Sequence, residues 1–302
     1  MEITCFLLSK FPFRSADTWK KRLDLEWITQ DGKPLFPGDR VRAEPPLNIY
    51  HPRFIEPSVP DEVAILEQNA DYILAFKPAP MPMHPGGRYN RNTFISILQA
   101  KTSTDENFEN QSNCSHELSS TNKARTLRII HRLDATTSGL VLTGHNPGFS
   151  REVQRLFYEN QVKKRYLAHV SGTPSENEVY VDRPIKRKNG YIFECHPNGK
   201  DSLTRFHVLK RMDTSSLVCC EPVTGRTHQI RLHLSEWGYP VIDDPVYGSD
   251  CGLYLRNMGS DYLQPLQNTA ISLIHYQLGI PSMKLDFNLL DYIDATVIPF
   301  PG

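Results

Sequence analysis

The chain has 302 residues, of which 39% are hydrophobic and 23% are charged. A chain of this length and composition folds as one large domain or two ordinary ones, and it is unlike a wholly disordered protein. Its 34 basic and 34 acidic residues cancel. No basic excess therefore marks a nucleic-acid-binding protein, and any site for a polyanion has to come from local clustering of charge.

The cysteines and the N-terminus bear on the compartment. No stretch of the sequence approaches the roughly 20 apolar residues that a membrane-spanning helix needs. The short apolar run near the N-terminus follows an acidic residue, Glu2, which is atypical of a signal peptide. The six cysteines form no CxxC pair and are too sparse for a disulfide framework. We therefore expect a soluble cytoplasmic protein that does not associate with membranes.

The first part of the chain has the pattern of a small separate unit. Residues 14–23 predict a short helix, and Ile28 starts a strand that enters a turn at Asp31 and Gly32. The proline-rich residues 45–60 lack helical periodicity and predict a semi-rigid linker. We therefore expect an N-terminal unit over 1–44, a linker over 45–60 and a larger domain over 61–302.

The larger domain alternates apolar runs with helical patterns. Tyr72–Phe76 is an apolar run that predicts a buried strand, and the polar residues 102–122 predict a surface loop inserted into the domain. Because strands and helices mix without a regular alternation, we predict an α+β fold with a mixed, mostly antiparallel sheet, flanking helices and a small α/β N-terminal module. Further strands are expected at 127–130, 140–142 and 165–170, and helices from 93, from 146 and over 228–237.

One candidate for chemistry is the segment HRLDATTSG at residues 131–139. Asp134 lies in a loop between two expected strands, with Arg132 two residues before it and three hydroxyl side chains after it. A carboxylate held in this way is partly desolvated and can act as a nucleophile or a general base. The alternative is a loop cap, in which Asp134 and the hydroxyl groups bond their own backbone, and the segment taken alone favours it.

A second candidate is the segment TGRTHQIRLH at residues 224–233. Hydroxyl and backbone donors at a helix start suit an anion. Arg231 lies about 100° around the helix from Ile230, so it can leave the apolar face and pair with a carboxylate. The alternative is a solvated helix face. His228 and His233 lack the i, i+4 spacing and the intervening Glu of zinc proteases, so we expect no metal site.

A third candidate is the basic run VKKRY at residues 162–166. On RNA its cations would meet phosphates and the Tyr166 ring would stack on a base. The alternative, which the run taken alone favours, is a basic surface turn with Tyr166 as half-buried packing. Similar basic clusters occur at residues 20–22, 123–128 and 183–188, so the neutral chain is electrostatically uneven.

Together these segments resemble the RluA-type pseudouridine synthases over roughly residues 62–250. Residues 10–42 resemble the S4 RNA-binding module that often precedes that domain. Asp243 stands where the family usually has Gly, and residues 274–278 match the family's closing stretch only loosely. The matching motifs, in order, are KP and PMHPG within residues 77–86, HRLD with TSGL within 131–140, KRYL at 164–167, TGRTHQIR at 224–231 and DPVYG at 244–248.

The resemblance implies an enzyme that isomerises uridine to pseudouridine in structured RNA without a cofactor. It implies that Asp134 is the catalytic nucleophile or base, that Arg231 pairs with it and that Tyr166 packs against the extruded uracil. Arg132 is then the candidate to fill the space that the uracil vacates. The RNA-binding residues that the resemblance implies are Arg14, Lys20, Lys77, His84, Arg132, Lys164, Arg226 and Gln229.

Two other functions remain possible on the sequence. One is an RNA-binding or ribosome-assembly factor with a decayed site, which has no need to retain Asp134, Tyr166 and Arg231 together. The other is a metal-dependent hydrolase that uses His131, His228 and His233, whose spacing is unsuitable. The S4-like unit favours ribosomal RNA as substrate and the HPGGRY segment favours tRNA, so the choice stays open. We expect a monomer.

Overall fold

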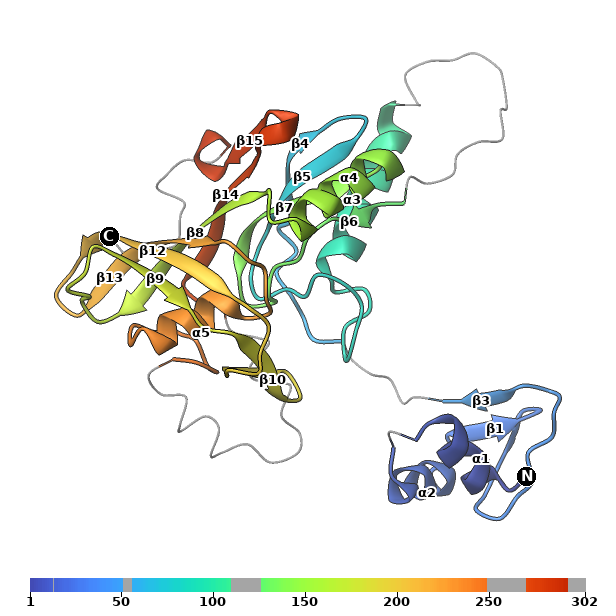
Figure 1. Cartoon of the computed structure of the whole chain (residues 1–302). Coiled ribbons are helices and arrows are strands. Elements are labelled where there is room, and N and C mark those ends of the chain that lie inside the picture. Colours follow the sequence, from blue (N-terminus) through green and yellow to red (C-terminus); the bar gives the residue numbers. More distant parts are fainter. Residues whose placement is uncertain (13, 51–55, 110–125, 249–269, 293–302) are drawn as a thin grey trace. The chain divides into compact units, whose positions relative to one another are not determined.

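The computed structural model describes residues 1–12, 14–50, 56–109, 126–248 and 270–292 (Figure 1). The chain divides into two compact units, Met1–Ile55 and Glu56–Gly302. None of the helices in these ranges combines the length and hydropathy that crossing a bilayer requires.

The first unit packs two helices against a small antiparallel sheet. Helix α2 (Ala16–Asp24) begins where the Ser15 side chain accepts a hydrogen bond from the Thr18 amide, as expected for an N-cap. The sheet has the order β2-β1-β3, formed by Lys33–Pro34, Ile28–Gln30 and Leu47–Ile49. Its core contains Trp19 together with apolar residues of α1 (Ile3–Lys10), of α2 and of β1.

The second unit is built on a ten-stranded mixed sheet. Its main path has the order β4-β5-β7-β14-β8-β13-β12-β9, while β6 pairs with β7 and β15 pairs with β14. Only the β7–β14 pair is parallel among the described strands. The bounds are β4 (Ala64–Gln68), β5 (Tyr72–Lys77), β6 (Arg128–Ile129), β7 (Ser138–Gly144), β8 (Lys163–Ser171), β9 (Glu178–Asp182), β12 (Leu203–Arg211), β13 (Ser215–Pro222), β14 (Leu273–Ile280) and β15 (Leu285–Asn288).

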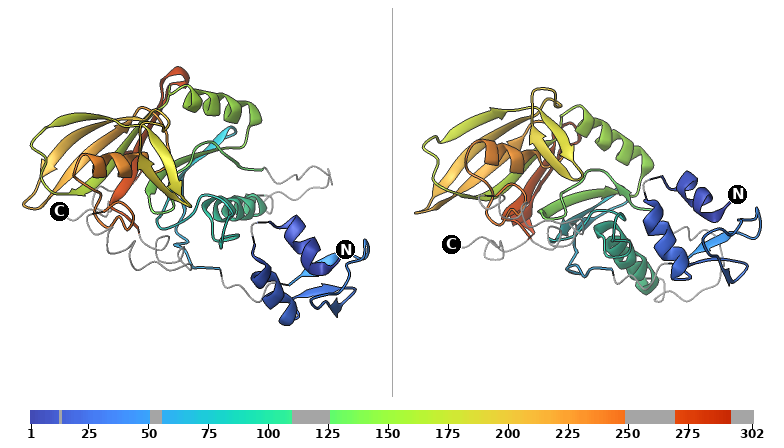
Figure 2. Two further views of the ribbon diagram at one scale, coloured as in Figure 1. Left: turned by 60° about the horizontal axis from the view of Figure 1, so that its bottom comes forward. Right: turned by 90° about the horizontal axis from the view of Figure 1, so that it is seen from below.

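Three helices cover the sheet, and side-chain alternation decides which face each one covers. Leu140 and Leu142 of β7 pack with Val153 of α4 (Pro147–Tyr158), whereas Val141 packs with Phe94 of α3 (Phe94–Glu109). Successive side chains of a strand point to opposite faces, so α4 and α3 lie on opposite sides. The left view of Figure 2 shows α4 above the sheet, with α3 and α5 (Gln229–Glu236) below it.

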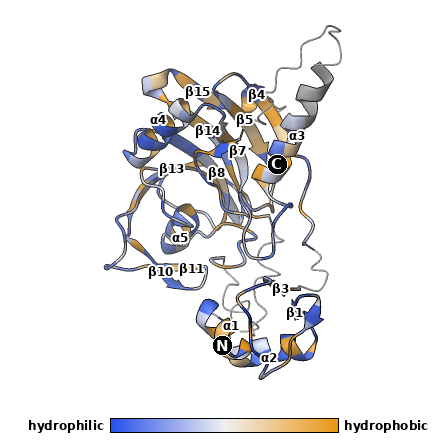
Figure 3. Cartoon of the chain, turned by 90° about the vertical axis from the view of Figure 1, so that its right-hand side faces the viewer, coloured by the Kyte–Doolittle hydropathy of each residue, from blue (hydrophilic) through white to orange (hydrophobic). Residues whose placement is uncertain are grey.

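The interior strands are apolar because both of their faces are covered. Residues of β5 are buried from Tyr72 to Ala75, as the continuous apolar run predicts. In Figure 3 hydrophobic residues lie along β5 and also along its neighbour β4, which is the edge strand of the sheet. A separate hairpin, β10 (Ile185–Asn189) with β11 (Ile192–Cys195), packs against α5, and two short 3₁₀ turns, Pro281–Met283 and Leu289–Asp291, flank β15.

The structure confirms most of the expected elements and corrects three. Residues 3–10 form a helix that the sequence did not predict, because the apolar residues of this short run show no helical periodicity. The expected linker over 45–60 is wrong at Leu47–Ile49, which form β3 and pair with β1. The expected loop over 102–122 is wrong for its first part, since α3 continues to Glu109; the remainder lies outside the described residues.

Gly139 lies where β7 meets β14, and its backbone is open only to glycine. Its φ is +125°, and a Cβ there would overlap the carbonyl oxygen of His275. We expect Gly139→Ala to destabilise the protein by about 2 kcal/mol or more, because backbone strain and a backbone clash add. Chemical denaturation measures this change. The matched control is Gly190→Ala, which has φ +44° but no neighbour within 4 Å and therefore tests strain alone. Equal losses in both variants would contradict the clash.

Candidate active site

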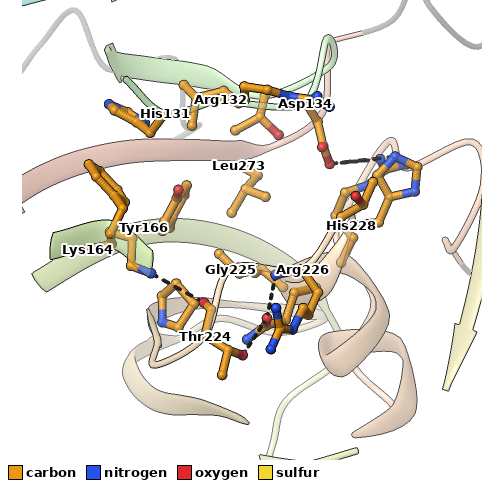
Figure 4. A pocket seen from close by; sticks show the side chains of 18 of the residues that line it. His131, Arg132, Asp134, Lys164, Tyr166, Thr224, Gly225, Arg226, His228 and Leu273 are labelled. Carbon is orange, nitrogen blue, oxygen red and sulfur yellow. Dashed lines mark hydrogen bonds and ion pairs between the residues drawn. The ribbon is translucent and has the colours of Figure 1, made fainter. Parts of the chain in front are cut away.

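Asp134 lies in the loop between β6 and β7 (Figure 4). The loop is held in place because Ala135 accepts hydrogen bonds at its carbonyl oxygen from the Met81 amide (2.8 Å) and from Lys77 Nζ (3.3 Å). The Asp134 side chain is 24% exposed and lines a cavity of about 930 Å³. A fixed loop thus presents a carboxylate to a large cavity.

Arg231 of α5 joins this carboxylate to a second one. Its Nε and Nη2 donate to the two oxygens of Asp244 at 2.7 and 2.8 Å, which is a bidentate pair. Its Nη1 donates to Asp134 Oδ2 at 3.2 Å. Asp244 Oδ1 also accepts the amides of Val246 and Tyr247. Because Asp244 fixes the plane of the guanidinium, the remaining nitrogen is aimed at Asp134.

The charges of this cluster keep both carboxylates ionised. Burial opposes ionisation of Asp134, but the neighbouring His228 and Arg231 and the hydrogen bond from Arg231 outweigh it, so the pKa of Asp134 lies below its ordinary value. The pKa of Asp244 is lowered as well: burial opposes this, and the bond and charge of Arg231 outweigh it. At neutral pH the cavity therefore contains an ionised carboxylate with one fixed cationic partner.

His228 stands on the other side of Asp134, with Nε2 3.9 Å from Asp134 Oδ2 (Figure 4). The Phe193 amide donates to Tyr247 Oη (3.0 Å), and the same hydroxyl shares a hydrogen bond with His228 Nδ1 (2.8 Å). The Tyr247 contact holds the ring so that Nε2 faces the carboxylate. Burial lowers the pKa of His228 although Asp134 opposes this shift. The residue has φ +57°, a strained conformation typical of functional positions.

Tyr166 of β8 forms another wall of the cavity, and a row of rings supports it. Its ring stacks on His275 with centroids 4.5 Å apart, His275 meets His131 edge-on, and His131 stacks on Phe157 at 4.9 Å. Burial and the negative charge of Asp134 raise the pKa of Tyr166. Its hydroxyl therefore stays protonated at neutral pH. The row ties the end of α4 to the loop that carries Asp134.

Most of the residues expected to bind RNA divide between the cavity and the N-terminal unit. Lys164, Arg226 and Arg132 line the large cavity. His84 lines a smaller adjoining cavity of about 280 Å³, which Asp134 and Arg132 also line. Arg14 and Lys20 belong to the first unit, where the Arg14 guanidinium lies over the Trp19 ring and Lys20 is exposed.

Two of the residues expected to contact RNA are buried and bonded within the protein. Lys77 is fully buried, and its ammonium donates to the carbonyl oxygens of Pro78, Met81 and Ala135, so it ties loops together instead of reaching a ligand. Gln229 is also buried. Its Oε1 accepts from the Thr224 hydroxyl and the Arg226 amide, and its Nε2 donates to Leu203 and Thr204. These bonds also occupy two of the donors that the sequence suggested for an anion, the Thr224 hydroxyl and the Arg226 amide.

The histidines proposed for a metal-dependent hydrolase have other partners. His233 bonds the Thr204 hydroxyl and the Arg183 carbonyl oxygen through its two ring nitrogens, and His131 Nε2 accepts the Leu142 amide. Within the described ranges, no group of three or more His, Cys, Asp or Glu side chains is placed to hold a metal ion.

The sequence did not identify three supporting residues: Asp244, Tyr247 and His275. Asp244 and Tyr247 lie in the DPVYG motif, which carried the family resemblance without a role for either side chain. A buried arginine needs a carboxylate partner, and an Asp in a motif that follows the helix of Arg231 was the available signal.

Removal of the Asp244 charge tests whether Asp244 holds Arg231. We expect Asp244→Asn to destabilise the protein by about 3–5 kcal/mol at pH 7, because it leaves a buried guanidinium without its partner. The folded pKa of Asp244 is lowered. The contribution of Asp244 to the free energy of unfolding is therefore full above its pKa in the unfolded chain, about 4. It is lost as the pH falls through the pKa of Asp244 in the folded protein. Urea denaturation from pH 7 to pH 3 measures both effects.

The control is Asp286→Asn, an exposed carboxylate that only accepts from the Gln277 amide. It should change the stability by less than about 0.5 kcal/mol. An Asp244→Asn variant as stable as the wild type at pH 7 would show that Arg231 does not depend on Asp244.

Comparison with known proteins places this geometry in a family. The family model described as RNA pseudouridylate synthase matches residues 71–236. RNA pseudouridine synthase 7 of Arabidopsis thaliana is 34% identical over 249 residues, which cover 79% of this chain and 58% of that protein. An uncharacterised RNA pseudouridine synthase of Bacillus subtilis is 28% identical, with coverage of 80% and 78%. A mouse pseudouridylate synthase is 30% identical, but the match spans only 40% of its length.

Solved structures agree with this result at the level of the fold. The human RNA pseudouridylate synthase domain-containing protein 1 superposes with a TM-score of 0.57 at 24% identity, covering 78% of this chain and 85% of that one. Protein 4 of the same human series gives a TM-score of 0.55. The motifs that meet around Asp134 lie within or next to the matched residues 71–236. This chain belongs to the RNA pseudouridylate synthase family.

Proposed function

We propose that the protein isomerises uridine to pseudouridine in structured RNA, with Asp134 as the catalytic carboxylate. The observation that carries the proposal is the pairing of Asp134 with Arg231 at 3.2 Å beside the half-buried Tyr166, in one cavity. An inactive RNA-binding factor is the alternative, and it gives no reason for a partly exposed carboxylate to be kept ionised by a buried arginine.

The reaction breaks the bond between uracil N1 and ribose C1′ and forms a bond between C5 and C1′. The proton leaves C5 and N1 gains one, so the composition of the nucleotide is unchanged. Positive character develops at C1′ during cleavage, as at the oxocarbenium-like centre of glycosidases. An ionised Asp134 at the cavity wall can assist this cleavage in three ways. It can capture C1′ covalently, attack the uracil ring, or remove a proton from the ribose.

The other residues of the cavity have separate roles in the proposal. Tyr166 packs against the uracil, and its protonated hydroxyl is a hydrogen-bond donor. A stacked uridine cannot reach Asp134, so it has to be extruded at a cost of a few kcal/mol. Arg132 is exposed beside Asp134 and lines both cavities, which suits a side chain that fills the vacated space.

The RNA class and the partners of the protein are proposals as well. The first unit, Met1–Ile55, is proposed as an S4-like RNA-binding module, with Arg14 and Lys20 as contacts. A relative from Buchnera aphidicola, 31% identical over 182 residues, is named for the ribosomal large subunit. This name and the S4-like unit favour ribosomal RNA over tRNA. We propose a monomer that acts in the cytoplasm, in keeping with the four free cysteines among the described residues.

Replacement of the catalytic carboxylate tests the reaction. We expect Asp134→Asn to abolish turnover while RNA binding and folding are retained, because the amide keeps the shape and removes the charge. Pseudouridine mapping by carbodiimide adducts and reverse-transcription stops would compare cells that lack the protein with cells rescued by wild type or by Asp134→Asn. A stop that is lost on deletion and returns only with wild type identifies both the reaction and the RNA. Restoration by Asp134→Asn would overturn the mechanism.

The pH dependence of RNA binding tests the cationic side of the cavity. Burial and the charge of Arg226 lower the pKa of Lys164 to about 8. A bound phosphate would raise this pKa, so affinity is full below pH 8 and falls as the pH rises through about 8. Fluorescence anisotropy with the mapped RNA measures this change. In Lys164→Arg, which stays charged, the decrease should disappear. The same decrease in Lys164→Arg would show that another group titrates.

A further inference from the structure

Away from Asp134 and Arg231, the large cavity is lined by basic side chains that have no carboxylate partner among the described residues. Lys164, Lys200 and Arg226 line it. Among the described residues, none of the three forms an ion pair with a carboxylate. The Lys164 ammonium donates to the carbonyl oxygen of Thr224, and the Arg226 guanidinium donates to the carbonyl oxygen of Asp201. Cations that share a wall repel each other, so this wall suits an anionic ligand such as a phosphate backbone.

An exposed aromatic side chain lines the same cavity. Tyr158, the last residue of α4, is 89% exposed, and yet it lines the cavity that contains Asp134. The end of the helix that carries Tyr158 is held in place, because the neighbouring Phe157 ring stacks on His131, three residues before Asp134. The ring is therefore exposed and available to a ligand beside the site.

The cavity is larger than one extruded nucleotide requires. Its volume of about 930 Å³ is at the upper end of the range for small-molecule pockets, roughly 300–1,000 Å³. The part that Asp134, Arg231 and Tyr166 form takes the uracil and its ribose. The remaining part, with Tyr158 and the unpaired cations, has room for a neighbouring nucleotide.

We propose that Tyr158 is a stacking platform for the base of a nucleotide next to the extruded uridine, whose phosphates lie against Lys164, Lys200 and Arg226. The occupant is single-stranded RNA, because an open ring face beside unpaired cations is the combination that binds unstacked bases and phosphates together. This inference rests on the proposed function and specifies how the strand enters its site.

The test measures binding of a fluorescently labelled oligouridylate of twelve nucleotides by anisotropy, with every variant made in Asp134→Asn so that turnover plays no part. Loss of one stacked base weakens binding by about five- to 150-fold, so we expect a decrease in this range for Tyr158→Ala. Tyr158→Phe, which keeps the ring, should bind within twofold. The matched control is Tyr180→Ala, because Tyr180 is 58% exposed but lies on β9 and does not line the cavity.

Fluorescence from a tryptophan at position 158 distinguishes RNA binding at this site from RNA binding by the first unit, Met1–Ile55. In Tyr158→Trp we expect the oligouridylate to quench the added tryptophan emission, measured against the parent protein. Unchanged affinity in Tyr158→Ala, equal losses in Tyr158→Ala and Tyr158→Phe, absence of quenching or no binding of the oligouridylate would each overturn the stacking platform. If pseudouridine forms in cells and Tyr158 proves irrelevant, this inference alone fails. If Tyr158 controls binding but no pseudouridine depends on the protein, the proposed function alone fails.

Discussion

The candidate site depends on one buried guanidinium that two carboxylates share. Asp244 takes the bidentate side of Arg231, with both of its oxygens bonded at 2.7 and 2.8 Å. Asp134 receives a single, longer bond of 3.2 Å. Two carboxylates and one cation leave a net negative charge, and Asp134 is the partner with fewer hydrogen bonds and more exposure. The arrangement therefore keeps Asp134 ionised and oriented without saturating it, which a nucleophile or base requires.

The sheet brings distant segments to this guanidinium. The parallel pairing of β7 with β14 sets Gly139 against His275, and β8 then pairs with β14 so that Tyr166 lies opposite His275. The loop before β7 and the ring on β8 are thereby one strand apart. The close approach at Gly139 excludes a side chain, so a single glycine decides whether β14 can fit between the two elements that carry the chemistry.

The sequence predicted the parts of this arrangement that have a local signal. Apolar runs predicted strands such as β5, and the Asn146 cap predicted the start of α4. The resemblance predicted that Asp134 pairs with Arg231. The bonds of Lys77 and the second partner of Arg231, Asp244, were not predicted, because they depend on which loops the fold brings together. A lysine at the end of an apolar strand is typical of a surface residue, and only three converging carbonyl oxygens make its burial tolerable.

The formal neutrality of the chain is compatible with a polyanionic substrate because charge is sorted between the two faces of the same strand. Arg165 of β8 pairs with Glu221 at 2.6 Å, and Glu221 also binds Arg205. The adjacent Lys164 points to the cavity side and has only a carbonyl partner. Acidic residues thus neutralise Arg165 and Arg205 away from the cavity, whereas Lys164, Lys200 and Arg226 inside it have no carboxylate partner among the described residues. Because phosphate affinity follows the local field rather than the net charge, an equal count of acids and bases does not weaken the RNA interface.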